Sequence, residues 1–365
     1  MKKILLCLFI IFTMFMVFAC DYSNTNDLVK DVVVTEYQDT METGDMYDEK
    51  SVYVNVTFTS GKKRIYCGND LTFDYSEFDS SEEGFYIIYI KINELNYTTS
   101  IEVEVIKKSF KVIMISNSYG DDTVQWVHEI ANKIRIKIAN LYIGGCVLQT
   151  HLNNLKTDAK AYQYVVYNSN SKSWTRKANT SIREALLDED WNYVALQQGS
   201  SQSGLPSTYD LIGDVMDEVL EIKEYVKFIW NMTWAYQQNS GHSSFGNYQN
   251  DQMIMYNAIL NAVQTKVVPN NRFVAIVPNG TAIQNARTSY IGDNLCRDKY
   301  CHLTNDLGRF IAGLTMVGKL NGADLTKVTY SPGLSEQDRK LAIKSAVNAI
   351  NNPFVITNST YKKIN

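Results

Sequence analysis

Ser118, Asp298 and His302 are the residues of this 365-residue chain whose types could together perform ester hydrolysis. Ser118 follows a continuous apolar segment at 110–115 and precedes a predicted helix, so a tight turn can present its hydroxyl group to a cleft. The alternative interpretation is that Ser118 is an N-cap of the predicted helix, a position that serine also favours. The chain has only four histidines, and a histidine with a nearby carboxylate can act as a general base with its orienting group.

Two further segments could supply hydrogen-bond donors. Gly145 follows a predicted strand at 138–143, where a glycine lets a backbone N–H approach a ligand closely. Gln198 follows a predicted strand at 193–196, where a side-chain amide can donate to a developing oxyanion. The alternatives are that Gly145 lies in an ordinary turn and that Gln198 is simply a polar loop residue. Because ligands bind at the carboxyl ends of strands in a parallel sheet, we expect these segments to converge there.

The elements that must position these residues alternate between strands and helices. Strands are predicted at 110–115, 138–143, 193–196, 228–232 and 273–277. Helices are predicted to start at Asp121 and to span 211–226, 252–267, 305–320 and 335–350, with an inserted hairpin at 162–167 and 174–176. The alternation predicts an α/β fold, a three-layer α/β/α domain with a parallel sheet, over residues 110–352. Residues 353–365 are expected to be a C-terminal tail.

Residues 29–107 follow a different, period-two pattern of short strands separated by turn signals. This pattern predicts an all-β sandwich. Its turns at 44–45 and 60–62 and its strand entry at 84–86 resemble bacterial Ig-like surface modules. Since no aromatic cluster stands out in this segment, a role as a spacer is favoured over glycan binding.

The first twenty residues are typical of an export signal. Lys2 and Lys3 precede an uninterrupted apolar run at 4–18 that is short for a membrane-spanning helix. The run ends at Ala19-Cys20, which resembles a lipobox in which Cys20 is acylated. We therefore expect a signal peptide at 1–19, a tether at 20–28 and an extracytoplasmic protein anchored to the bacterial cell membrane by lipid. An ordinary signal peptide or a signal anchor is the alternative.

Charge and cysteine content exclude some other classes of function. The formal net charge is −4, and removing residues 1–19 with their two lysines gives −4 − 2 = −6, so nucleic acid is not expected as a partner. The four cysteines after Cys20 do not form a dense disulfide framework. Cys296 and Cys301 can bridge in an oxidising compartment or stay as buried free thiols, and their spacing alone predicts no metal site.

The order of the polar segments (Ser, Gly, amide, then Asp and His) resembles that of the SGNH/GDSL hydrolase superfamily over residues 110–352. The sequence is most similar to an uncharacterised group of secreted SGNH-type proteins of the DUF4886 kind. The strings that carry this closer resemblance are 141–146 (LYIGGC), 196–200 (LQQGS), 233–237 (TWAYQ), 250–256, 280–284 (GTAIQ), 302–303 (HL) and 308–309 (GR).

The resemblance implies a role for each residue. Ser118 attacks the ester carbonyl, His302 takes the Ser118 proton and returns it to the leaving group, and Asp298 orients His302. The oxyanion hole consists of the backbone N–H groups of Ser118 and Gly145 with the side chain of Gln198. Neither a metal nor an organic cofactor is implied.

One spacing departs from the superfamily pattern. The acid and the histidine are usually separated by two residues, whereas three residues separate Asp298 from His302. Either the loop bulges, pinned by Cys296 and Cys301, or Asp298 is displaced and a Ser–His dyad remains. Asp293 is a less favoured substitute for the acid.

The expected substrate is an acylated glycan, since acetyl is the small acyl group that such exported relatives most commonly remove. The candidates for contacts with substrate are Asn117, Trp234, Tyr236, His151 and Phe245. His242 lies in a Gly/Ser-rich loop and is expected only to be solvated. The alternative function is a catalytically weak or inactive SGNH-fold lipoprotein that holds glycan at the surface.

Overall fold

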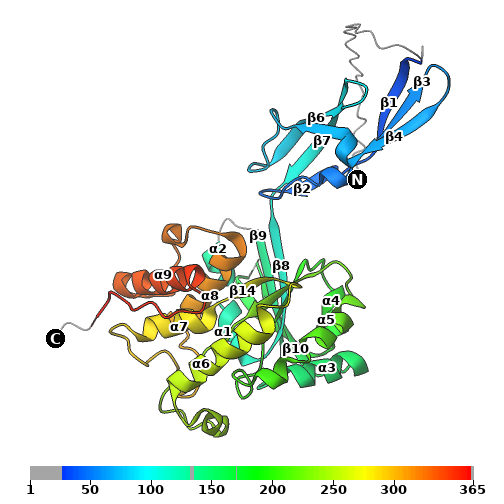
Figure 1. The fold of residues 1–365 in the computed structure, drawn as a ribbon. Helices are drawn as coiled ribbons and strands as arrows, with labels where there is room; N and C mark the ends of the chain where they lie inside the picture. The colour runs from blue at the N-terminus through cyan, green and yellow to red at the C-terminus, as the bar shows by residue number, and fades with distance from the viewer. Residues whose placement is uncertain (1–26, 132–134, 170, 363–365) are drawn as a thin grey trace. The chain divides into compact units, whose positions relative to one another are not determined.

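The computed structural model describes residues 27–131, 135–169 and 171–362. The chain divides into two compact units, Met1–Lys107 and Lys108–Asn365, drawn in Figure 1. The predicted signal peptide and Cys20, the predicted acylation site, lie outside the described residues. Within the described ranges, no helix has both the length and the apolar character needed to cross a membrane.

The N-terminal unit contains two sheets that enclose an apolar core. One has the order β1-β3-β4 and the other β2-β7-β6-β5. The strands are β1 (Val29–Glu36), β2 (Thr40–Glu42), β3 (Tyr53–Phe58), β4 (Lys63–Cys67), β5 (Leu71–Asp74), β6 (Gly84–Ile92) and β7 (Tyr97–Ile106). Inward-facing residues alternate with exposed ones, as Ile88, Ile90 and Ile92 of β6 show by their complete burial. The described part of this unit consists of strands in two sheets with two short 3-10 helices, and its assignment as an all-β Ig-like sandwich stays a prediction.

An aromatic cluster also lies in this unit, contrary to the expectation from the sequence. Phe78 contacts Tyr47, Tyr75 and Tyr86, with ring centroids 5.6–6.4 Å apart. Tyr75 and Phe78 lie in the loop after β5, whereas Tyr47 precedes β3 and Tyr86 lies in β6, so the cluster forms only when the unit folds. They pack against the core of the unit, and their first role is therefore structural.

The second unit is built on a seven-stranded mixed sheet of order β11-β10-β9-β8-β12-β13-β14. Its strands are β8 (Ser109–Ser116), β9 (Arg135–Tyr142), β10 (Tyr162–Asn168), β11 (Ser173–Thr180), β12 (Tyr193–Leu196), β13 (Lys227–Asn231) and β14 (Phe273–Val277). β9, β8, β12, β13 and β14 are parallel, and the predicted hairpin forms the antiparallel edge β10–β11. β8 and β12 lie in the middle and are almost entirely buried, which explains their unbroken apolar sequences.

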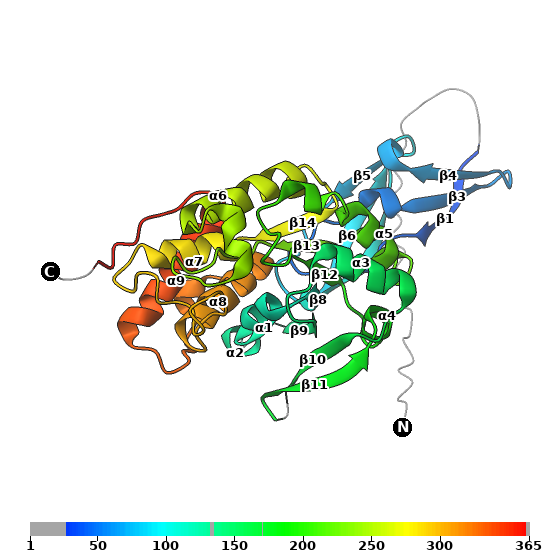
Figure 2. The same ribbon diagram turned by 90° about the horizontal axis from the view of Figure 1, so that it is seen from below.

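Helices cover both faces of this sheet, as Figure 2 shows. On one face lie α1 (Ser118–Val124), α2 (Val127–Ala131), α7 (Asn279–Arg287), α8 (Leu307–Asn321) and α9 (Glu336–Asn351). On the other lie α3 (Leu148–Thr157), α4 (Ile182–Leu187), α5 (Ile212–Leu220) and α6 (Gln252–Ala262), which continues as a π-helical turn to Val267. The α/β fold class is confirmed, whereas α3, α4 and α7 were not predicted because they are short or carry many polar residues.

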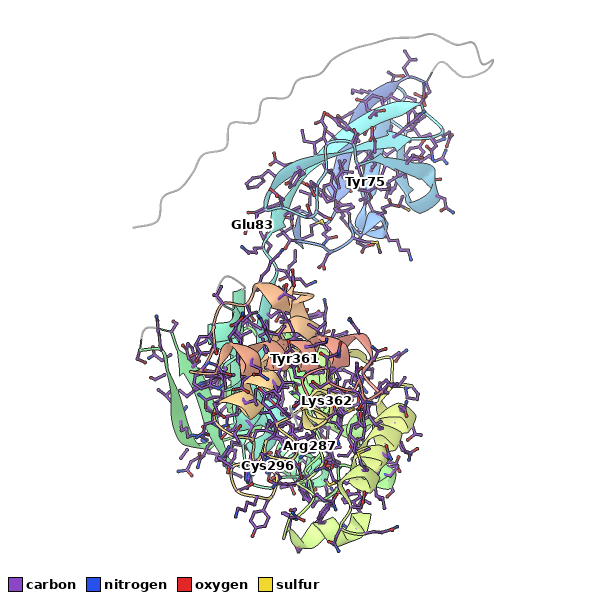
Figure 3. The ribbon with its side chains drawn as sticks, turned by 90° about the vertical axis from the view of Figure 1, so that its left-hand side faces the viewer. Tyr75, Glu83, Arg287, Cys296, Tyr361 and Lys362 are labelled. Carbon is purple, nitrogen blue, oxygen red and sulfur yellow. The ribbon has the colours of Figure 1, made fainter. Side chains whose placement is uncertain are left out.

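The C-terminal segment continues the fold beyond α9. Thr281 donates its hydroxyl hydrogen to the Pro353 carbonyl, and the Lys362 ammonium donates to the Thr288 carbonyl. Between them, the Thr357 N–H donates to the Asn285 side chain. Figure 3 labels Tyr361 and Lys362 in the unit that also holds Arg287. Residues 353–362 therefore lie along α7 as part of the domain.

One glycine sets how closely α7 approaches the sheet. Gly280 is the second residue of α7, and its N–H donates to the Met232 carbonyl at 2.8 Å. A Cβ atom at Gly280 would lie 2.3 Å from the backbone oxygen of Thr233. The helix therefore rests directly on the backbone that follows β13, which is the segment carrying Trp234.

Replacing this glycine should push α7 away from the sheet. We expect Gly280→Ala to lower the free energy of unfolding by about 1–3 kcal/mol, because the obstacle is backbone and cannot rotate away. Gly213 is the matched control: it is the second residue of α5, and a Cβ there meets nothing within 4 Å. Gly213→Ala should be neutral or slightly stabilising. Urea denaturation of both variants measures the difference, and equal effects would refute the close approach.

Candidate active site

Ser118 is the first residue of α1, directly after the central strand β8. The preceding residue, Asn117, is the N-cap, and its side chain accepts a hydrogen bond from the Tyr119 N–H at 3.0 Å. Ser118 itself is partly exposed, while Asn117 and Tyr119 are buried. Gly120 allows the helix to start this close to the sheet, since a Cβ there would overlap the Ser116 side chain. The turn therefore presents Ser118 and buries its neighbours.

A chain of buried side-chain amides crosses the carboxyl edge of the sheet beneath this turn. The Asn279 amide donates to Asn231 at 2.7 Å, Asn231 donates to Gln197 at 2.8 Å, and Gln197 donates to Asn117 at 2.8 Å. Asn117 in turn donates to the Cys146 carbonyl at 2.8 Å. These residues follow or end four adjacent strands, so the chain links the ends of β8, β12, β13 and β14.

This amide chain corrects the predicted role of Asn117. The side-chain oxygen of Asn117 accepts from Tyr119 and Gln197, and its nitrogen donates to Cys146. A side chain that is 2% exposed and has these partners is not free to bind substrate. Asn117 instead shapes the turns that carry Ser118 and Gly145.

Asp122 fixes the position of the loop that carries His302. Its side chain is fully buried, and it accepts from the Arg309 guanidinium at 2.8 Å, the Arg297 guanidinium at 3.1 Å and the Leu303 N–H at 2.7 Å. Burial raises the pKa of Asp122, while the two guanidinium groups and the Leu303 N–H act in the opposite direction. Asp122 lies one helical turn after Ser118, on the same face of α1. His302, adjacent to Leu303, is thereby held beside the helix that begins at Ser118.

Asp298 and His302 form a hydrogen-bonded pair despite their longer spacing. The Asp298 carboxylate accepts from the Nδ1 atom of His302 and from the N–H groups of Tyr300, Cys301 and His302 at 2.9, 3.0 and 3.2 Å. Lys299 adopts a left-handed conformation with φ of 60°, which accommodates the additional residue. Burial raises the pKa of Asp298, but these hydrogen bonds outweigh it and hold the pKa below its usual value.

The other carboxylate considered for this role, Asp293, lies elsewhere. It pairs with the buried Arg287 at 2.9 Å and accepts from the Gln238 N–H at 2.6 Å and the Gln252 amide at 2.8 Å. The longer spacing left two alternatives, a bulged loop or a displaced Asp298, and the structure therefore shows the bulged loop. The cysteines do not pin it through a disulfide, because Cys296 and Cys301 are both free and buried.

The buried side chain of Trp234 contacts both the turn of Ser118 and the loop of His302. Its indole N–H donates to the Cys301 carbonyl at 2.7 Å, and its ring stacks on Tyr119 with centroids 4.2 Å apart. Tyr119 and Cys301 are the chain neighbours of Ser118 and His302. Since Trp234 is 0% exposed, it cannot stack on a sugar, and the predicted substrate contact is wrong.

Tyr236, His151 and Phe245 are also buried, so the predicted aromatic platform does not exist. The Tyr236 hydroxyl donates to Ser200 at 3.0 Å. His151 lies 2.9 Å from the Tyr162 hydroxyl, in the layer formed by α3. Burial lowers the pKa of His151 to about 3, so the ring is neutral and serves the core.

Of the two predicted oxyanion donors that follow later strands, the structure exposes one and buries the other. Gly145 is exposed, with φ of 65° and open space on its Cβ side, so it stays a candidate oxyanion donor. Gln198 is buried, and its amide nitrogen donates to the carbonyl and hydroxyl groups of Thr208 at 3.1 and 2.9 Å. Its oxygen accepts from Leu148 and Gly199. Gln198 is therefore not placed to donate to an oxyanion, and Gln197 is the glutamine that faces the turn of Ser118.

The sequence did not indicate that His242 lies near the candidate site. Burial lowers the pKa of His242, His302 acts in the same direction and the Asp298 charge acts in the opposite direction. The Nδ1 atom of His242 accepts from the Ser244 N–H at 3.2 Å, which leaves the hydrogen on Nε2. The adjacent Gly241 approaches the Tyr300 ring. The glycines and serines of this loop conceal that contact in the sequence.

Comparison with known proteins identifies the family. The model of the domain of unknown function DUF4886 matches residues 111–349. The chain belongs to the DUF4886 family. A solved DUF4886 family protein from Bacteroides uniformis is 37% identical, with a TM-score of 0.66, covering 70% of this chain and 100% of that chain. A Slackia heliotrinireducens protein, provisionally named an SGNH hydrolase, is 15% identical with a TM-score of 0.36, covering 59% and 100%. No curated protein matches the chain.

The buried charge of Asp122 should be essential for stability. We expect Asp122→Asn to lower the free energy of unfolding by about 3–5 kcal/mol, because it leaves the charges of Arg309 and Arg297 without a buried partner. The control is Asp190→Asn: Asp190 pairs with Lys223 but is 86% exposed, so its loss should cost less than about 1 kcal/mol. Urea denaturation distinguishes the two. A loss for Asp122→Asn no larger than that of the control would contradict this role.

Proposed function

We propose that this DUF4886 family protein is a serine ester hydrolase of the SGNH type. The observation that carries the proposal is the Asp298–His302 pair, held through Leu303 and Asp122 beside the helix that begins at Ser118. A nucleophile on a strand-to-helix turn, a histidine and an orienting carboxylate are the three groups that acyl transfer needs. Their order along the chain, with Gly145 between them, is that of the SGNH/GDSL hydrolases.

The proposed reaction proceeds through an acyl-enzyme. The Ser118 oxygen attacks the ester carbonyl while its proton passes to Nε2 of His302, and the Asp298 carboxylate stabilises the resulting imidazolium. The N–H groups of Ser118 and Gly145 stabilise the negative oxygen of the tetrahedral intermediate. The intermediate expels the alkoxide, which takes the proton from His302 and leaves as the alcohol. Water then attacks the acyl group with His302 as base, releasing the acid and restoring Ser118.

The proposed substrate is an acetylated glycan outside the cytoplasm. This part of the proposal is supported by the predicted export signal and the Ala19-Cys20 junction, because an exported enzyme meets envelope and extracellular glycans. The alternative, an inactive glycan-binding lipoprotein, was supported by the unusual acid-to-histidine spacing. The hydrogen bond between Asp298 and His302 removes that support.

Ester hydrolysis should depend on Ser118 and His302. Purified protein should release acetate from at least one member of a panel of acetylated polysaccharides and should hydrolyse p-nitrophenyl acetate. Ser118→Ala should reduce the rate to that of buffer, and His302→Ala should reduce kcat by about 10²–10⁴-fold. Ser173→Ala, on the exposed strand β11, is the matched control and should retain the full rate. A fluorophosphonate should label Ser118 alone; equal turnover by Ser118→Ala would refute the proposal.

Anchoring should depend on Cys20. Cells that express the full chain should hold the protein in the detergent phase of a phase-partition experiment and incorporate radiolabelled palmitate into it. Cys20→Ala should abolish the label, while Cys67→Ser, in an exposed position of the mature chain, should not. Undiminished incorporation by Cys20→Ala would exclude acylation at this residue.

A further inference from the structure

A cysteine lies beside the Asp298–His302 pair, and the proposed reaction gives it no role. One ligand atom each from Asp298, Cys301 and His302 can be chosen so that all of them lie within 4.8 Å of one another. They come from a single loop that Asp122 and Trp234 hold in place through Leu303 and the Cys301 carbonyl. We propose that this trio, here called the loop ligands, binds Zn²⁺ or a similar thiophilic cation and thereby switches off the proposed esterase. The inference deepens the proposed function and rests on it.

The donor set suits zinc. Zn²⁺ is bound by thiolate, imidazole and carboxylate ligands, and sites with three protein ligands keep a fourth position for water. Bonds of about 2.0–2.3 Å to a tetrahedral ion place the ligand atoms about 3.5 Å apart. The loop ligands therefore need only small side-chain movements to close around the ion. The thiolate selects a soft cation over Mg²⁺ or Ca²⁺, which prefer oxygen ligands.

The partly exposed side chains of His302 and Asp298 give the cation a route of entry to the site. The side chains of His302 and Asp298 are 33% and 26% exposed, whereas Cys301 is only 5% exposed. Burial raises the pKa of the Cys301 thiol to about 12, and the Asp298 charge acts in the same direction. The thiol therefore keeps its proton until a cation displaces it. The other ionisable groups that influence the thiol are Tyr119, Cys296 and Asp122.

Zinc binding would disable the base by changing its tautomer. In the proposed reaction, Nδ1 of His302 carries the hydrogen toward Asp298 and Nε2 has the free electron pair. Coordination of Zn²⁺ by Nδ1 moves the imidazole hydrogen to Nε2, and the Cys301 thiol releases its proton to solvent. One proton is thus released for each ion bound. An imidazole with hydrogen on Nε2 cannot accept the Ser118 proton, so hydrolysis stops.

Isothermal titration of the full mature chain with ZnCl₂ tests the site directly. We expect one ion per chain, an affinity that rises about tenfold per pH unit between pH 6.5 and 8.5 because one proton is released, and a thiolate-to-metal charge-transfer band with Co²⁺. Cys301→Ser should weaken zinc binding at least about 100-fold and remove the band, because it removes a direct ligand. Cys67→Ser and Cys296→Ser are the control variants and should keep both.

Inhibition of ester hydrolysis by zinc shows whether binding at the loop ligands switches off the proposed esterase. Zinc should inhibit wild-type hydrolysis at the concentrations that saturate the titration, and Cys301→Ser should require at least about 100-fold more, each measured against its own uninhibited rate. Equal inhibition of both proteins, or no binding to the wild type, would overturn the proposal. Ser118→Ala should bind zinc as tightly as the wild type. If zinc binds through Cys301 while no ester is hydrolysed, the metal site stands and the proposed function fails.

Discussion

The buried carboxylate of Asp122 is the interaction on which the proposed site depends. It lies one turn into α1, and it joins that helix to Arg309 at the start of α8 and to Arg297 and Leu303 of the His302 loop. A buried charge is tolerated only when it is fully paired, so the loop has little freedom to adopt another position. The same side chain thus connects the helix that begins with the proposed nucleophile to the loop that carries the proposed base.

The amide chain and Trp234 extend this constraint across the carboxyl edge of the sheet. Each amide from Asn279 to Asn117 donates to the next, and buried hydrogen bonds of this kind strengthen one another. Trp234 satisfies the Cys301 carbonyl and supports Tyr119. Several residues that resembled substrate contacts in the sequence therefore serve to position others. The groups left for the proposed substrate contacts are the exposed Gly145 and the partly exposed Ser118 and His242.

The bulged loop of Asp298 also explains why one segment could serve two chemistries. The loop that wraps three N–H groups around the carboxylate also brings the buried Cys301 side chain close to the acid–base pair. The proposed ester hydrolysis uses Nε2 of His302 to accept the Ser118 proton, and the proposed zinc site uses Nδ1. The two uses exclude each other because an imidazole cannot present a free electron pair on both nitrogens while it carries one hydrogen.

The sequence by itself determined the α/β class, the five parallel strands and the candidates Ser118, Gly145, Asp298 and His302. Buried parallel strands are unbroken apolar segments, and polar residues after them mark the carboxyl edge. Only the tertiary structure decided that Gln197 and not Gln198 faces the turn of Ser118, because the partners that orient two adjacent glutamines come from distant segments. Likewise, only the packed loop decided that Asp298 reaches His302, since that contact depends on Asp122, Lys299 and Trp234, which are brought together by folding.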